Sequence, residues 1–200
     1  MARPVETYRG ILPQTASARP RRPFRLSILV PLLAVCAIAG GGIAAGSAHA
    51  TARTETSLRA LNHKLLTAIN GFRAAHHLVP LRESRALDRS ARAHSLEMGR
   101  DGYFGHSSAD GTEFWRRIAQ YYRSRNYSYW SVGENLLWAS PSVGAKRALA
   151  LWIASPEHLR NLLTVRWREI GVSAVHVSGA SGVFNGQAVT IITSDFGVRK

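Results

Sequence analysis

The sequence predicts an α+β domain in which several helices precede a pair of antiparallel strands. After about residue 57, apolar residues recur every three or four positions, which is the period of an amphipathic helix. Two stretches near the end of the chain instead alternate apolar with small polar residues, as half-buried strands do. Because helical and strand-like segments do not alternate, we expect separate layers, as in an α+β fold or an α-β-α sandwich.

Four helices are expected in the first part of this region. The first covers 58–72, where leucine, isoleucine and phenylalanine form one stripe, and the second covers about 84–100. A third begins after residues 110–112, whose Asp, Gly and Thr are typical of a helix start, and a fourth covers 142–154. His94 falls on the inward face of the second helix, so we expect a hydrogen-bonded core residue there.

The two strand-like stretches are 170–177 and 188–196, and the glycine-containing segment 178–186 is predicted to be the hairpin loop between them. Residues 126–130 are polar and aromatic and indicate an exposed connection or a short strand. Gly133-Glu134-Asn135 is interpreted as a turn, because Gly and Asn favour turn conformations.

The first 50 residues have the composition of a targeting segment. Basic residues are followed by an apolar run from Leu26 to about Ala39, and small residues continue up to Ala48-His49-Ala50. This is the order of a secretory signal peptide, and Arg21-Arg22 partly resembles a twin-arginine signal. Cys36, the only cysteine, lies within the apolar run, so the remainder of the chain must fold without disulfides.

The sequence thus divides into a signal peptide or N-terminal membrane anchor, residues 1–50, and one exported domain, residues 51–200. Cleavage would release the domain, whereas an uncleaved segment would tether it through residues 26–45, because a membrane span needs about 20 apolar residues. A transmembrane helix is therefore possible. In either case we expect a secreted or cell-surface protein.

The exported region is basic. The chain has a formal net charge of +14, to which the first 50 residues contribute six Arg and one Glu, so residues 51–200 carry +9. A basic extracellular domain attracts anionic polymers or anionic lipid. The arginines are scattered and no nucleic-acid-binding motif is present, so nucleic acid is not expected as a partner. The sequence names no specific extracellular ligand, and lipid and a cell-wall polymer are its candidate classes.

Three short motifs carry most of the chemistry that the sequence offers. They are Phe104-Gly105-His106-Ser107, Gly133-Glu134-Asn135, and the segment from Trp152 to His158. The motifs lie far apart in the chain, so only tertiary folding can bring their side chains together. Two imidazoles and a carboxylate in one cleft are able to hold a divalent cation or to move a proton.

The order and spacing of these motifs resemble the CAP superfamily, the group of cysteine-rich secretory, antigen 5 and pathogenesis-related 1 proteins. The closer resemblance is to its short bacterial members, which lack cysteines, and it covers about residues 62–197. It also rests on Asn70-Gly71-Phe72-Arg73, Val79-Pro80-Leu81, Ser155-Pro156-Glu157-His158-Leu159-Arg160-Asn161, Ile170-Gly171-Val172 and Thr193-Ser194-Asp195-Phe196-Gly197. The resemblance implies a three-layer α-β-α sandwich of the CAP type, with an SCP-like domain and a central cleft.

The resemblance also implies a set of site residues, because family members with a complete site hold two His and two Glu in the cleft. His106 and His158 match the two histidines and Glu134 matches one Glu, so these three are the candidate ligands of a divalent, zinc-like cation. Ser155 stands at the position of the other Glu, which removes one anionic ligand. Whether the neighbouring Glu157 replaces it stays open.

The same residues also fit a structural interpretation, in which the imidazoles are hydrogen-bonded to Glu134 and no ion is bound. Asn135, Ser155 and Asn161 are candidates for residues that support the cleft, since side-chain amides satisfy backbone groups in irregular loops. Ser155-Pro156 is further interpreted as the end of one helix and the N-cap of another.

Two functions follow from the sequence. The favoured one is an extracellular binding or interaction module whose His/Glu cleft is a candidate cation site. The alternative is a metal-dependent hydrolase that uses the same cleft, with Glu134 as ligand or base. No catalytic residue is assigned, and a serine hydrolase is disfavoured because the sequence has no Gly-x-Ser-x-Gly motif.

Overall fold

The structure is a computed structural model that describes residues 45–200, with side chains from residue 58 onward. The predicted targeting segment lies outside these residues, apart from the first turns of a helix. Among the described residues, no helix combines the length and the apolar character that crossing a membrane requires.

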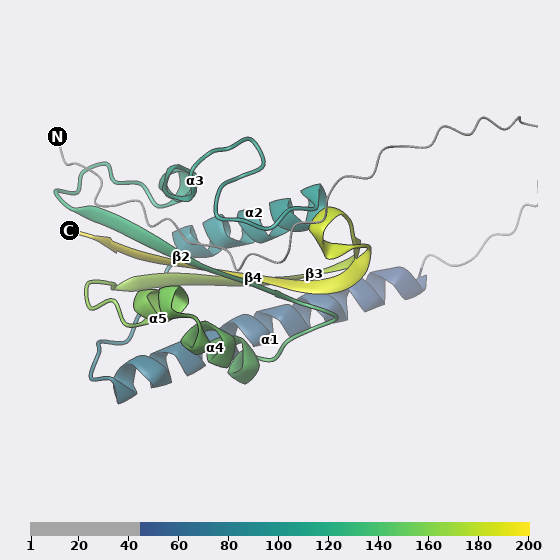
Figure 1. The fold of residues 1–200 in the computed structure, drawn as a ribbon, viewed down its shortest axis with the longest axis horizontal. Helices are drawn as coiled ribbons and strands as arrows, with labels where there is room; N and C mark the ends of the chain where they lie inside the picture. Colours follow the sequence, from purple (N-terminus) through teal and green to yellow (C-terminus); the bar gives the residue numbers. More distant parts are fainter. Residues whose placement is uncertain (1–44) are drawn as a thin grey trace, which may run out of the picture.

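A four-stranded sheet forms the middle layer of the domain (Figure 1). In space the strands follow the order β1 (Arg82–Glu83), β3 (Glu169–Ala180), β4 (Gln187–Arg199) and β2 (Trp130–Ala139). The strand β1 is parallel to β3, whereas β4 is antiparallel to both of its neighbours. This order leaves β2 at an edge of the sheet, with only β4 as its partner.

Helices cover both faces of the sheet (Figure 1). One face carries α2 (Arg85–Asp101) and α3 (Phe114–Tyr121). The other carries α1 (Ala45–Ala75), α4 (Ala145–Ala154) and α5 (Pro156–Leu162). The result is the three-layer α-β-α arrangement within the α+β class that the sequence predicts.

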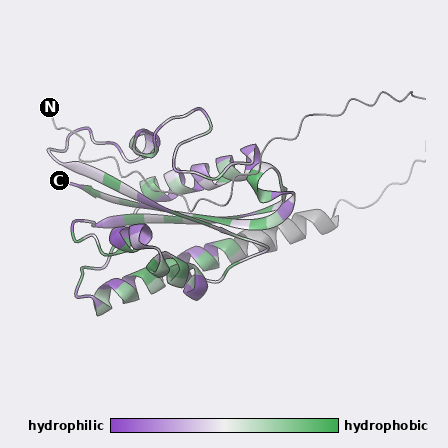
Figure 2. Cartoon of the chain, viewed as in Figure 1, coloured by the Kyte–Doolittle hydropathy of each residue, from purple (hydrophilic) through white to green (hydrophobic). Residues whose placement is uncertain are grey.

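The core is divided between the two faces because successive strand residues point to opposite sides. On β4, Ile192 and Phe196 pack with Leu65 and Trp152 on the α1 side, whereas Ile191 packs with Met98 on the α2 side. Apolar residues accordingly recur along both β3 and β4 (Figure 2). Each fully buried side chain of this size contributes about 1.5–3 kcal/mol to folding.

Most predicted elements are confirmed, but one is wrong. The first helix begins earlier than residue 58, and the two C-terminal strands extend a few residues beyond their predicted bounds. Gly133-Glu134-Asn135 is not a turn, because it lies within the strand β2. Its glycine serves close packing instead: a Cβ atom on Gly133 would lie 2.9 Å from the Trp167 ring and 3.0 Å from Asn161 Oδ1.

The outer edge of β2 is closed by side chains from α4 and α5. Trp152 Nε1 donates to the carbonyl of Leu136 at 3.0 Å, and Asn161 Nδ2 donates to the carbonyl of Glu134 at 2.9 Å. An edge strand with free carbonyls pairs readily with other chains, so these contacts protect it. They also fix α5 beside the strand that carries Glu134.

Candidate functional site

Glu134 lies at the centre of a polar cluster on the side of the sheet that α2 and α3 cover. Its carboxylate is 1% exposed, with Oε1 2.8 Å from His106 Nδ1 and Oε2 paired with Arg117 Nη2. Burial alone would raise the pKa of Glu134, but the hydrogen bond from His106 and the charge of Arg117 outweigh it and lower that pKa. Glu134 is therefore ionised at neutral pH.

The contact with Glu134 determines how the His106 ring is protonated. An ionised carboxylate only accepts hydrogen bonds, so Nδ1 of His106 donates to Oε1 of Glu134. In the neutral ring, the lone pair then resides on Nε2. The His106 side chain is 41% exposed, so this nitrogen belongs to a ring that ligands from solvent are able to reach.

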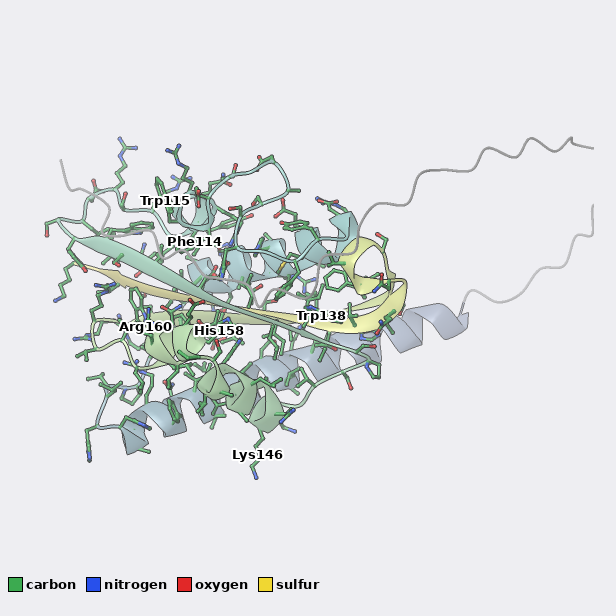
Figure 3. All side chains as sticks on the ribbon, in the orientation of Figure 1. Phe114, Trp115, Trp138, Lys146, His158 and Arg160 are labelled. Carbon is green, nitrogen blue, oxygen red and sulfur yellow. The ribbon has the colours of Figure 1, made fainter. Side chains whose placement is uncertain are left out.

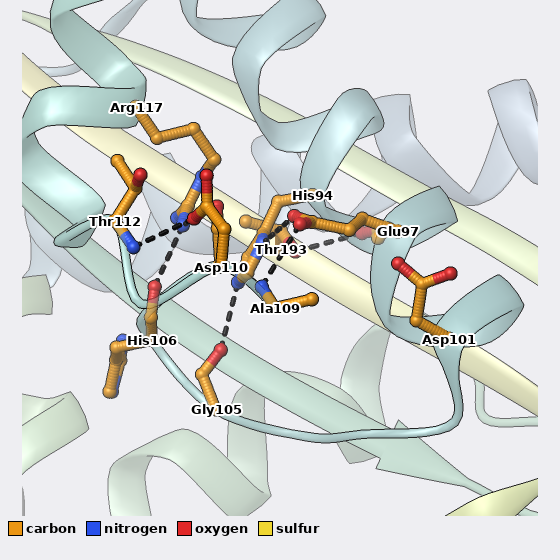
Figure 4. A network of polar contacts seen from close by, with 12 residues as sticks. His94, Glu97, Asp101, Gly105, His106, Ala109, Asp110, Thr112, Arg117 and Thr193 are labelled. Carbon is orange, nitrogen blue, oxygen red and sulfur yellow. Dashed lines mark hydrogen bonds and ion pairs between the residues drawn. The ribbon is translucent and has the colours of Figure 1, made fainter.

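Arg117 joins Glu134 to the loop that carries His106. Its side chain is 6% exposed, and Nη1 donates to the backbone carbonyl of His106 at 2.7 Å. The same guanidinium therefore neutralises the buried carboxylate. It also fixes the backbone of its histidine partner, through the bond to the His106 carbonyl that Figure 4 draws.

The loop is held from the other side by α2 (Figure 4). His94 Nε2 donates to the carbonyl of Gly105 at 2.9 Å, and the backbone N–H of Ala109 donates to Glu97 at 3.1 Å. His94 is completely buried, and burial lowers its pKa. The predicted role of His94 as a hydrogen-bonded core residue is thus confirmed, and it positions the loop next to His106.

His158 approaches from α5, on the opposite face of the sheet (Figure 3). Asn135 Nδ2 donates to the carbonyl of His158 at 3.1 Å, while Asn161 Nδ2 bridges to Asn135 Oδ1 at 2.9 Å. Burial, followed by the electrostatic interaction with His106, lowers the pKa of His158. His158 is therefore a neutral imidazole at pH 7, and it lies within electrostatic reach of His106.

Asp195 is a further ionisable group of the cluster, and the sequence did not single it out as a site residue. It is the direct cross-strand partner of Glu134 and is completely buried. Among the described residues, neither of its carboxyl oxygens has a hydrogen-bond partner. Burial and the neighbouring Glu134 carboxylate raise the pKa of Asp195 well above its ordinary value. Its signal in the sequence is a single acidic residue within a predicted strand.

Comparison with known proteins assigns the family. The family model described as the cysteine-rich secretory protein family, or CAP, matches residues 66–193. This chain belongs to the CAP family. It is 30% identical over 128 residues to the uncharacterized protein YkwD of Bacillus subtilis strain 168, an alignment that covers 64% of this chain and 47% of YkwD. The chain thus spans about half the length of this curated relative.

Solved structures share the CAP fold. An extracellular protein of Bacillus anthracis that contains an SCP domain is 21% identical, with a TM-score of 0.58, and the match covers 80% of this chain and 45% of that one. An outer surface protein of Borrelia burgdorferi is 22% identical, with a TM-score of 0.52 over 68% of this chain and 90% of that one. At this identity the likeness establishes the fold alone.

The fold brings together some of the predicted site residues and not others. The His106 ring contacts Glu134 directly, whereas His158 is joined by its backbone carbonyl to Asn135 Nδ2, and Asn161 connects Asn135 to the carbonyl of Glu134. Within residues 58–200, no group of three or more His, Cys, Asp and Glu side chains is arranged to hold a metal ion. Both oxygens of Glu134 are already occupied by His106 and Arg117.

Two further candidates lie at the start of α5. Ser155 occupies the N-cap position directly before Pro156, as predicted, but its hydroxyl makes no capping hydrogen bond. Glu157 acts on His158 through its charge, which partly opposes the lowering of the pKa of that histidine. The structure therefore gives Glu157 an electrostatic influence on the cleft.

Asp195 makes the stability of this CAP domain depend on pH. Its folded pKa is raised, so the folded state holds a proton that the unfolded chain releases above its ordinary pKa of 3.8. The free energy of unfolding therefore falls as pH rises from this value through the folded pKa. We expect Asp195→Asn, which mimics the neutral acid, to match the wild type near pH 4 and to exceed it in stability at pH 8. Urea unfolding at both pH values checks this, and equal stability of the two proteins at pH 8 would contradict it.

Proposed function

We propose that this CAP chain is an extracellular binding module whose cleft takes up a divalent, zinc-like cation. The extracellular location is supported by the targeting pattern of residues 1–50 and by the fold it shares with an extracellular and an outer surface protein. Binding of the cation is supported by the chemistry of the His106 and His158 imidazoles.

The observation that carries the proposal is the hydrogen bond from His106 Nδ1 to Glu134 Oε1, at 2.8 Å. Histidine ligands of metals usually donate their second ring N–H to a carboxylate, which fixes the tautomer and makes the ligating nitrogen more basic. His106 has this arrangement, and His158 is neutral, as a ligand must be. Glu134 then orients His106 and is not itself a ligand.

This donor set fits a weakly held cation that completes its coordination with water. Two neutral imidazoles are suitable zinc ligands, but tetrahedral protein sites commonly supply three or four protein ligands. A bound cation would supply a Lewis-acidic position for an anionic or carbonyl oxygen of an extracellular ligand. His106 and His158 would hold it, while Arg117 and Glu134 keep the first ring in place.

Binding is favoured over the alternative of hydrolysis. An effective general base has a pKa near the working pH, but Arg117 and His106 hold the pKa of Glu134 below its ordinary value and occupy both of its oxygens. Glu134 is therefore a poor base for activating water, and the cleft offers a binding site with a fixed charge arrangement.

The proposal predicts a zinc-dependent rise in melting temperature. A cation at a hundredfold excess over its Kd stabilises the native state by about 2.7 kcal/mol, which corresponds to about 5–10 °C for a domain of this size. We expect this rise in the wild type and in the control variant His63→Ala, whose imidazole is exposed on α1. We expect it to be lost in His106→Ala and in His158→Ala.

Differential scanning fluorimetry with and without zinc measures these shifts. Because protonated imidazoles do not bind cations, the wild-type shift should also diminish as the solution is acidified. An equal zinc shift in all four proteins would show that the ion binds elsewhere. No shift in the wild type would mean that His106, Glu134 and His158 have a structural role and bind no cation.

A further inference from the structure

The topology of the sheet gathers four separate segments at one end of the molecule. Trp130 at the start of β2 pairs with Arg199 near the end of β4, and Glu169 at the start of β3 pairs with Gly197. The segments 76–83, 122–129, 163–169 and 198–200 therefore lie at this end, on the left in Figure 1. We call this surface the basic end.

The basic end carries a large excess of positive charge. Its seven cationic residues are Arg82, Arg123, Arg125, Arg166, Arg168, Arg199 and Lys200, and its two carboxylates are Glu83 and Glu169. Glu169 is already engaged by Arg199 at 3.7 Å and by the Tyr122 hydroxyl. Three connections leave the opposite end of the molecule: 101–113, 139–145 and 178–187. Together they contain three carboxylates and no Lys or Arg.

Ring contacts and backbone hydrogen bonds join the segments that carry these cations. The Arg199 guanidinium lies over the Tyr122 ring at 4.1 Å and over the Tyr127 ring at 5.0 Å, and Tyr127 is 42% exposed. The backbones of Tyr129 and Lys200 exchange hydrogen bonds at 3.1 and 3.0 Å. The segment that carries the exposed Arg123 and Arg125 is therefore fastened to the end of β4.

We propose that the basic end binds an extended polyanion whose repeating units carry phosphate. Guanidinium groups pair with phosphate through two parallel hydrogen bonds, and six of the seven cations are arginines. The charges are spread over several connections, a layout that matches a chain of phosphates better than a single small anion.

The position of α1 favours a polymer over a lipid bilayer. This 31-residue helix begins at the opposite end and runs to the basic end, a length of about 45 Å at ~1.5 Å per residue. A membrane tether formed by residues 26–45 would therefore leave the basic end pointing away from the membrane. The surface is separate from the His/Glu cleft, so loss of cation binding would leave this proposal intact.

The test uses inorganic polyphosphate as the probe and two variants with the same change in net charge. Arg123→Glu/Arg125→Glu alters the basic end, whereas Lys146→Glu/Arg147→Glu alters exposed positions on α4, away from it (Lys146 is labelled in Figure 3). Fluorescence anisotropy with labelled polyphosphate gives the Kd of each purified protein at several salt concentrations. We expect the first variant to bind at least about tenfold more weakly, with a salt slope reduced by about 1–2, and the second to change less than about threefold.

Three results would overturn the proposal. Equal weakening by the two variants would mean that net charge alone attracts the polymer. Tighter binding to phosphatidylglycerol vesicles than to polyphosphate would assign the surface to a membrane. Wild-type binding that does not weaken with salt would exclude phosphate contacts. Thermal unfolding of both variants within about 2 °C of the wild type confirms that altered binding is not a folding defect.

Discussion

Arg117→Ala is expected to lower the free energy of unfolding by about 3–5 kcal/mol at pH 7, because it leaves the Glu134 carboxylate buried without its counter-charge. Arg117 also holds the carbonyl of His106 at 2.7 Å, so the loop that carries this histidine loses an anchor. Urea denaturation monitored by tryptophan fluorescence measures the change.

The neighbouring Arg116 provides the control for this substitution. It is exposed, and its guanidinium lies over the Trp115 ring at 4.8 Å, so Arg116→Ala should cost less than about 1 kcal/mol. In the Arg117→Ala protein, Glu134 is able to take up a proton and so avoid being a buried, unpaired charge. The loss of stability of this variant relative to the wild type should therefore shrink as pH falls. Equal losses for the two arginine variants would show that Glu134 does not depend on Arg117.

Trp152→Ala is expected to be similarly costly, at about 3–5 kcal/mol, because it removes a completely buried side chain from between α4 and the sheet. It also removes the donor to the Leu136 carbonyl at the edge of β2.

Trp152→Phe separates the two effects, since it keeps an aromatic ring but leaves the carbonyl without its donor. We expect a loss of about 1–3 kcal/mol, measured by urea denaturation as before. Hydrogen exchange should also report faster opening of β2. If Trp152→Phe were as stable as the wild type, the contact with Leu136 would not be what closes the strand edge.

The helices and the C-terminal strands could be predicted because their patterns are local. The stripe along 58–72 and the alternation in 170–177 and 188–196 each reflect one packed face. The strand β2 was not predicted at Gly133-Glu134-Asn135, because its polar residues are buried only through partners that come from α3 and α5. Such partners are distant in sequence, so propensity alone favoured a turn.

The candidate site shows the same limit. The sequence singled out His106 and Glu134, which the fold brings into contact. It gave no reason to choose Arg117 over the adjacent Arg116, because only the orientation of α3 decides which of them is buried. Asp195 was likewise treated as part of a terminal motif, and its role depends on a cross-strand pairing with Glu134 that no local pattern encodes.

The most direct test of the proposed function is an NMR measurement of the histidine ring nitrogens, in the wild-type protein at pH 7, before and after the addition of zinc. Long-range ¹H–¹⁵N correlation spectra distinguish the tautomers. We predict that His106 carries a proton on Nδ1, that His158 is neutral, and that zinc shifts the signals of these two rings while leaving His63 and His94 unchanged. A His106 ring without a proton on Nδ1, or a zinc response confined to other histidines, would contradict the account of this cleft as a cation-binding site.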